Sequence, residues 1–166
     1  MTLCGCLVSD PKEYRSPERT PPLLLLTKAE PSVFKLRRVS YGSQVDFNVP
    51  FRSEDAGEKL LARLRVNYTL PNEEGAGERP LNASTFDDES RAATLSWVPS
   101  KREVDPGCQQ LSLLVAHDSS ITTFDKGLLI LDPKDVAVAV WTLWVDDPAD
   151  SEAIPGLDGC PVQETQ

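Results

Sequence analysis

The sequence has a single histidine, His117, and this scarcity limits the chemistry open to the chain. Its four cysteines include no C-x-x-C pair, so the ligands of an ordinary zinc site are missing. The motifs G-x-S-x-G, G-x-x-x-x-G-K-[ST] and H-E-x-x-H, which mark serine hydrolases, nucleotide-binding proteins and zinc proteases, are also absent. His117 has Asp118 and Ser119 as sequence neighbours, whereas the members of a catalytic triad come from separate elements. We predict a non-catalytic protein with no cofactor and no metal, in which His117 is partly exposed at the end of a strand.

Positive charge and long apolar runs are also scarce. Seventeen basic residues stand against 26 acidic ones, for a formal net charge of -9. This charge repels phosphate backbones and anionic headgroups, so we expect no nucleic acid among the partners. The longest apolar runs, 23–26 and 136–145, fall short of the roughly 20 residues of a membrane-spanning helix. The sequence therefore predicts no transmembrane helix.

Short alternating segments, separated by turns, are the main feature that is present. Fourteen prolines lie scattered between apolar runs, a pattern typical of strands and turns. Apolar residues occupy every second position of 45–51, which predicts a strand with one buried face. Further strands are expected at 23–27, 33–39, 60–68, 93–97, 111–117 and 136–145, with long exposed loops at 71–80 and 118–134. The sequence thus predicts an all-β fold, a two-sheet antiparallel immunoglobulin-like sandwich of seven or eight strands over residues 23–147.

The first residues, Leu3-Cys4-Gly5-Cys6, resemble a bacterial lipobox. The resemblance implies that Cys6 is lipidated and becomes the mature N-terminus. Only three residues precede Cys4, so either the chain starts further upstream or these are ordinary surface or disulfide-bonded cysteines. The charged, proline-containing stretch that follows is suited to a flexible tether, which gives 1–22 as a lipobox-like start and tether. The last segment, 148–166, is predicted to be an acidic tail.

Two pairs of segments resemble known bacterial surface proteins. The runs Val45-Asp46-Phe47-Asn48-Val49-Pro50-Phe51 and 54–60 are similar to the strand and acidic turn of cadherin-like and related immunoglobulin-like domains. The segments 106–118 and 141–146 resemble the last two strands of lipoproteins common in myxobacteria. The resemblance implies a lipid-anchored protein of the cell envelope, at the outer membrane, with an envelope or surface protein as partner. It transfers no substrate and no catalytic residue.

Calcium binding between cadherin domains makes the acidic turn residues worth testing as ligands. The spaced Asp-x-Asp and Asp-x-Asn-Asp elements of that site are missing, so we predict solvated turn carboxylates instead. The residues concerned are Glu54, Asp55, Asp118, Asp146 and Asp147.

The second cysteine pair is predicted to form a disulfide. Cys108 begins one strand and Cys160 lies in the tail, so a bridge between them would staple the tail to the sandwich. An oxidising compartment would allow this bond, and two free thiols are the alternative.

Two surfaces are candidates for binding. The apolar run Leu128, Leu129, Ile130 and Leu131 within the 118–134 loop is the candidate binding loop, although an added edge strand would explain it as well. Exposed tryptophans at 97, 141 and 144 would instead indicate a carbohydrate-binding β-sandwich module, with core packing as the plainer interpretation.

Overall fold

Ten strands and three short 3-10 helices make up the part of the chain that the computed structural model describes, namely residues 19–55, 57–67, 74–83, 91–124 and 127–147 with Cys160. In chain order the strands are β1 (Leu23–Leu24), β2 (Arg37–Ser40), β3 (Val45–Arg52), β4 (Leu60–Val66), β5 (Glu74–Leu81), β6 (Arg91–Trp97), β7 (Gly107–His117), β8 (Ile121–Phe124), β9 (Gly127–Ile130) and β10 (Val136–Asp146). The helices are η1 (Leu26–Lys28), η2 (Asp118–Ser120) and η3 (Pro133–Asp135).

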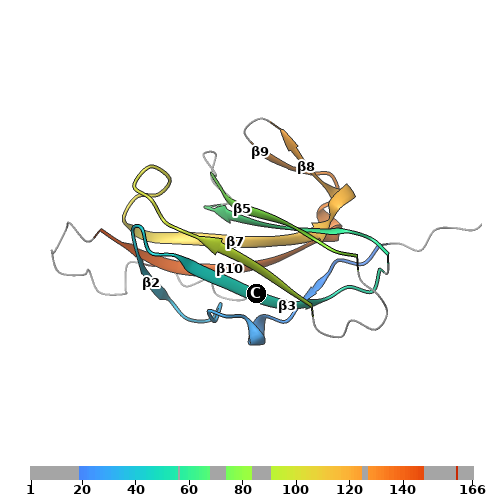
Figure 1. Ribbon diagram of the computed structural model, residues 1–166, viewed down its shortest axis with the longest axis horizontal. Coiled ribbons are helices and arrows are strands. Elements are labelled where there is room, and N and C mark those ends of the chain that lie inside the picture. Colours follow the sequence, from blue (N-terminus) through green and yellow to red (C-terminus); the bar gives the residue numbers. More distant parts are fainter. Residues whose placement is uncertain are drawn as a thin grey trace, which may run out of the picture.

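Eight of these strands form two facing sheets (Figure 1). One sheet has the order β1-β3-β6 and the other the order β2-β10-β7-β4-β5, while β8 and β9 pair only with each other. In an immunoglobulin-like sandwich, strands A, B and E of one sheet face strands C, F and G of the other, and an added strand can lie beside C. Here β1, β3 and β6 take the places of A, B and E, and β4, β7 and β10 those of C, F and G, with β5 as the added strand. The all-β immunoglobulin-like sandwich is confirmed, with eight strands in its two sheets.

One pairing departs from the predicted antiparallel arrangement. β2 runs parallel to β10, with Val39 opposite Val145. After β1, at the edge of the three-stranded sheet, the chain passes through η1 to the edge of the other sheet, where β2 has the direction of β10. Alternation in a sequence shows which face of a strand is buried but not the direction of its neighbour, which is why this pairing was missed.

The core lies between the two sheets, with aromatic side chains near its centre. Phe47 of β3 and Trp141 of β10 are fully buried, and their ring centroids lie 4.8 Å apart in an edge-on arrangement. The Trp141 indole nitrogen also donates a hydrogen bond of 2.8 Å to the carbonyl oxygen of Pro31, in the segment that crosses between the sheets. This bond gives the polar end of a buried tryptophan its partner.

The 71–80 segment, predicted to be a loop, contributes most of β5 instead. β5 is an edge strand, paired with β4 on one side. An edge position tolerates glycines and Pro80, which would weaken a central strand. The predicted first strands are shorter than expected, since β1 has two residues and β2 begins at Arg37, because the chain between them crosses from sheet to sheet.

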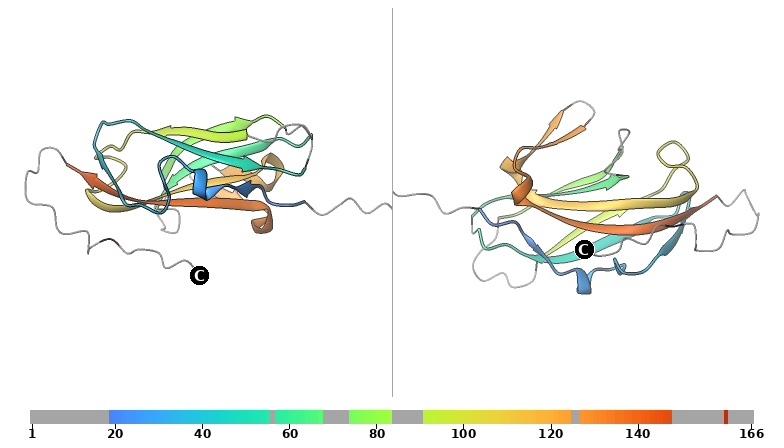
Figure 2. Two further views of the ribbon diagram at one scale, coloured as in Figure 1. Left: turned by 90° about the horizontal axis from the view of Figure 1, so that it is seen from below. Right: turned by 180° about the vertical axis from the view of Figure 1, so that it is seen from behind.

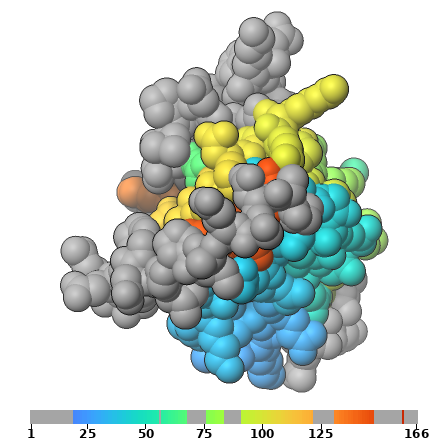
Figure 3. Space-filling model, turned by 90° about the vertical axis from the view of Figure 1, so that its left-hand side faces the viewer, coloured from blue at the N-terminus to red at the C-terminus, as the bar shows by residue number. Residues whose placement is uncertain are grey.

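The end of the sandwich where β10 finishes is closed by side chains. The Tyr41 hydroxyl donates a hydrogen bond of 2.9 Å to the carbonyl oxygen of Val104, and Arg38 binds both carboxylate oxygens of Asp146 at 3.0 Å. Figure 3 views this end and shows the residues that precede β7 (yellow) against the start of β3 (cyan). The contacts tie the β6–β7 connection to β2 and β10.

Candidate functional site

The predicted loop 118–134 folds as a hairpin that leaves the sandwich (Figure 2). Ile121 of β8 lies opposite Ile130 of β9, and the Leu131 amide donates a hydrogen bond of 2.9 Å to the Ser120 carbonyl. Leu128, Leu129 and Ile130 therefore belong to a strand rather than to a loop, because pairing with β8 satisfies their backbone. Their side chains lie outside the described part of the chain. Leu131, just after β9, is described and is 57% exposed.

Below this hairpin lies the face of the five-stranded sheet that points away from the three-stranded sheet, here termed the outer face. Three strands contribute to it in register, so that residues of β4, β7 and β10 form three rows across the sheet. From the hairpin inward, the rows are Leu61-Ala116-Val136, Arg63-Leu114-Val138 and Arg65-Ser112-Val140. In the first row Leu61 and Ala116 pack against Ile121, so an apolar cluster fixes the root of the hairpin.

The β4 column of the outer face carries two arginines. Arg63 and Arg65 are 5% and 7% exposed, far less than is usual for arginine. Arg63 forms an ion pair with Glu78, its cross-strand neighbour on β5, whose side chain is 48% exposed. Burial lowers the pKa of the Arg63 guanidinium; nearby Arg65 also lowers it, whereas Glu78 and Asp118 oppose the shift.

Arg65 has a different environment from Arg63. Its cross-strand neighbours are Gly75 on β5 and Ser112 on β7, and neither supplies a carboxylate. Among the described residues, none forms a hydrogen bond or an ion pair with Arg65, and none accepts a hydrogen bond from the buried Nε of Arg63. Among the described residues, Glu78 forms an ion pair with Arg63, and Asp118 is near enough to raise the pKa of Arg63. The strand expected at 60–68 gives no sign of this environment, since its alternation places both arginines on a polar side.

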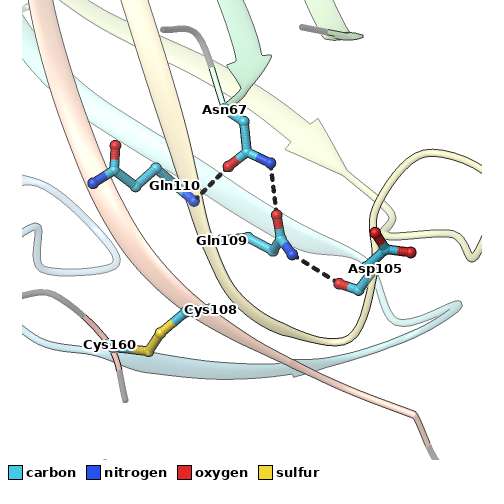
Figure 4. The surroundings of a disulfide bond; sticks show 6 residues. All are labelled: Asn67, Asp105, Cys108, Gln109, Gln110 and Cys160. Atoms are coloured by element: carbon cyan, nitrogen blue, oxygen red, sulfur yellow. Dashed lines mark hydrogen bonds between the residues drawn. A yellow bond between two sulfur atoms is a disulfide. The ribbon is translucent and has the colours of Figure 1, made fainter. Parts of the chain in front are cut away.

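A disulfide joins Cys108 to Cys160, the pair that the sequence analysis singled out, with their Cα atoms 5.5 Å apart (Figure 4). Cys108 shares its face of β7 with Ser112, so the bond holds Cys160 on the outer face, where it is 7% exposed. The tail around Cys160 lies outside the described residues.

Beside the disulfide, a hydrogen-bond network fixes the start of β7 (Figure 4). The Asn67 side chain accepts a hydrogen bond from the Gln110 amide and donates one to Gln109, which in turn donates to the Asp105 carbonyl. Because both ends of the Asn67 amide are engaged, this side chain has a structural role.

At the opposite end of β7, His117 is completely buried rather than partly exposed as predicted. Its Nδ1 lies 2.6 Å from Asp135 Oδ1, and its Nε2 lies 3.4 Å from Asp55 Oδ2. Asp55 also accepts hydrogen bonds from the backbone and side chain of Thr20. Asp135 of η3 gives the buried ring its hydrogen-bond partner, whereas Nε2 lies near Asp55 without a hydrogen bond. Neither carboxylate is a neighbour of His117 in sequence.

The acidic residues considered as calcium ligands are spread over the molecule. Asp55 lies beside His117, whereas Asp146 binds Arg38 and Asp147 pairs with Lys101 at the other end of the sandwich. In the described ranges, no group of three or more His, Cys, Asp or Glu residues is arranged to hold a metal ion.

The tryptophans do not form a row on one surface. Trp97 and Trp141 are 3% and 0% exposed and pack in the core. Trp144 has the opposite parity on β10 and is half-buried on the outer face, opposite Cys108.

Cys6, the predicted lipidation site, and the rest of the lipobox-like start lie outside the described residues. The described residues contain no helix with the length and apolar character needed to cross a bilayer.

Comparison with known proteins gives structural likenesses only. The chain matches no protein-family model and no curated protein. A chain of the complex between zinc 2-glycoprotein and prolactin inducible protein from human seminal plasma is similar at 14% identity and a TM-score of 0.38, over 66% of this chain and 87% of that one. The CARDB domain of a Pyrococcus furiosus protein, solved with di-metal ions, is similar at 13% identity and a TM-score of 0.39, over 79% and 97%. At these TM-scores the likenesses add nothing to the fold and site described above.

Proposed function

We propose that this chain is a non-catalytic lipoprotein of the bacterial cell envelope, held at the outer membrane by a lipid on Cys6, whose immunoglobulin-like domain binds a protein partner. The observation that carries the proposal is the β8–β9 hairpin, which stands outside the sandwich and ends at the exposed Leu131. Binding residues are commonly presented in this way, on connections held by a rigid scaffold. The apolar cluster of Leu61, Ala116 and Ile121 supplies that rigidity at the hairpin root.

The Cys108–Cys160 disulfide supports export. Structural disulfides persist in oxidising compartments such as the periplasm and the cell surface, and are rare in the cytosol. An envelope location is therefore consistent with the bond and with the lipobox-like start.

The environment of His117 supports a non-catalytic role. A general base has to come within hydrogen-bonding distance of its substrate, and this side chain is 0% exposed between two carboxylates. Because the sequence has no second histidine, histidine-based catalysis has no other candidate.

A protein partner is favoured over a carbohydrate. Sugar rings stack on exposed aromatic faces, and two of the three tryptophans are in the core, where Trp141 is in contact with Phe47. Trp144 alone offers too small a platform for a row of sugar rings.

The lipid anchor is tested by the intact mass of the native protein from the host's membrane fraction. We expect a chain that starts at Cys6 and carries added acyl mass, and a Cys6→Ser variant that stays unacylated and leaves that fraction. An unprocessed wild-type chain in the soluble fraction would contradict the anchor.

The binding role is tested by placing a photo-crosslinking residue at Leu131 and, as a matched control, at Phe34, which is 63% exposed away from the hairpin. In the native envelope we expect one discrete cross-linked protein from position 131 and none from position 34. Equal patterns from both positions would argue against the hairpin as a binding element.

A further inference from the structure

One edge of the sandwich differs in charge from the rest of the molecule. The segment 23–40, which runs through β1 and η1 to β2, contains four basic residues and one acidic residue, whereas the rest of the chain has 13 basic and 25 acidic ones. In Figure 1 this segment (blue) forms the lower margin of the molecule, and η1 projects from it. The edge is therefore locally positive in a protein of net charge -9.

Three of the four basic side chains face water. Lys28, Lys35 and Arg37 are exposed, and none of them forms an ion pair with a residue that the structure describes. The fourth, Arg38, binds both carboxylate oxygens of Asp146. The charge of the first three is thus available to a group outside the domain.

Two large apolar side chains are exposed in the same segment. Phe34 and Leu23 are 63% and 61% exposed, the highest values among the large apolar residues that the structure describes. Their sequence neighbours Val33 and Leu24 pack against the core instead. A single exposed apolar residue is ordinary on a protein surface, but here two of them occur with unpaired basic residues in one short segment.

The backbone on both sides of Phe34 is fixed to the sandwich. Before it, Glu30 exchanges two backbone hydrogen bonds with Asn48, of 2.8 and 2.7 Å, and the Trp141 indole nitrogen donates to the Pro31 carbonyl. After it, β2 pairs with β10. The exposed ring and the basic residues around it are therefore presented by a well-anchored part of the fold.

We propose that this edge docks on the surface of the phospholipid bilayer that holds the lipid anchor. We term it the basic edge and define it by Leu23, Lys28, Phe34, Lys35 and Arg37. Exposed apolar side chains can enter the headgroup region, while lysine and arginine beside them reach the lipid phosphates. Each basic residue close to an anionic bilayer strengthens binding about fivefold.

The net charge of -9 opposes long-range attraction to such a surface, and the anchor makes that attraction unnecessary. A lipid on Cys6 holds the domain beside the bilayer at a high effective concentration. At physiological ionic strength charges are screened over about 8 Å, so the basic edge interacts with the headgroups while the more distant acidic residues largely do not. A free polyanion has no such tether and is still expected not to bind.

This inference rests on the proposed function and adds an orientation to it. The β8–β9 hairpin stands on the upper side of the molecule in Figure 1 and in the right-hand view of Figure 2, whereas the segment 23–40 lies on the lower side. A domain that rests on its basic edge therefore points the hairpin away from the bilayer, where a protein partner can reach it.

The test uses the full chain with an N-terminal histidine tag, bound to vesicles of phosphatidylethanolamine and phosphatidylglycerol that contain a nickel-chelating lipid. The tag replaces the anchor, so a failure of lipidation at Cys6 leaves this test valid, and a failure of docking leaves the mass test of Cys6 unaffected. Benzoylphenylalanine at position 34 reports contact by forming lipid adducts, which mass spectrometry counts. Position 138 is the control, because Val138 is 41% exposed on the outer face.

We expect lipid adducts from position 34 and few or none from position 138. Changing Lys35→Gln and Arg37→Gln together should reduce the adducts from position 34 about tenfold or more, because two basic contacts are lost. As a matched control, Arg102→Gln with Lys134→Gln removes two exposed basic residues outside the basic edge and should leave the adducts unchanged.

Three results would overturn the proposal. They are equal lipid adducts from positions 34 and 138, adducts that do not depend on Lys35 and Arg37, and a discrete protein cross-linked from position 34 in the native envelope, which would assign the basic edge to a protein partner. Salt gives a check that needs no variant. Raising it to about 0.5 M shortens the screening length and should lower the wild-type adducts, and an unchanged number would also contradict docking through charge.

Discussion

His117 Nδ1 lies 2.6 Å from Asp135 Oδ1 at a buried end of the sandwich, where the two residues are 0% and 1% exposed. Asp135 also accepts a hydrogen bond from the His117 backbone amide, so one carboxylate serves two groups of the same residue. The contact joins β7 to η3 and thereby fixes the position from which the hairpin leaves the sheet.

Replacing Asp135 by alanine should destabilise the fold strongly. His117 would stay buried without its closest partner, and breaking a buried pair of this kind costs about 3 kcal/mol. The free energy of unfolding, measured by urea denaturation, gives the size of the effect. Asp105→Asn is the control, because Asp105 is exposed and accepts the hydrogen bond from Gln109 through its backbone carbonyl. A value for Asp135→Ala equal to that of the wild type would show that the pair is energetically neutral.

Reduction of the Cys108–Cys160 disulfide should lower the free energy of unfolding by about 4 kcal/mol, because a bond between residues 52 positions apart restricts the unfolded chain. Urea denaturation with and without a reducing agent measures this loss. The Cys160→Ser variant should have the reduced stability already and show no response to the agent. If that variant responds as the wild type does, the agent acts elsewhere.

Acid should weaken the fold through Asp46 and Asp146. Hydrogen bonds from Ser96 and then Gln44 lower the pKa of Asp46, and those from Arg38 lower the pKa of Asp146. Since both pKa values are depressed in the folded state, the stabilising contribution is complete above the unfolded-state value of about 4 and is lost as the pH falls through the folded-state values.

The urea midpoint between pH 6 and pH 2.5 tests this direction. Asp146→Asn should have a lower midpoint than the wild type at pH 6 and a smaller decline in acid. A decline as steep as that of the wild type would assign the acid sensitivity to other groups.

Trp141→Phe should cost about 2 kcal/mol, since it removes the hydrogen bond to Pro31 and part of the contact with Phe47. Trp144→Phe should have a much smaller effect, because that side chain is half-buried on the outer face. Thermal and urea unfolding of the two variants, compared with the wild type, measure the difference. Equal losses would mean that burial at position 141 is not what stabilises the core.

The sequence was informative wherever one face of a strand is buried. The alternation at 45–51 and 111–117 predicted β3 and most of β7, because burying every second side chain requires that pattern. The sequence did not predict β5, whose glycines and proline are tolerated only because an edge strand has a free side. It also failed for β8 and β9, which pair with each other and with neither main sheet.

The candidate site was less predictable than the fold. The run 128–131 was found from its apolar character. The surroundings of the β4 arginines follow only from the strand register, which sets Arg65 between Gly75 and Ser112. Similarly, the partners of His117 are Asp135, 18 residues away, and Asp55 from another part of the chain. Contacts of this range depend on how the strands pair, and a single sequence does not encode strand pairing locally.

The parallel pairing of β2 with β10 also determines how the domain responds to mechanical force. Residues Arg37 to Ser40 of β2 lie beside Leu143 to Asp146 of β10 in four residue pairs, and the two strands run in the same direction. Tension between the N-terminal and C-terminal sides of the domain pulls these strands lengthwise in opposite directions, so their hydrogen bonds are loaded in shear and have to break together. The Arg38–Asp146 pair adds a side-chain link to the same patch. A domain tethered at its N-terminal side and pulled by a partner should therefore yield late and abruptly, rather than unzip strand by strand.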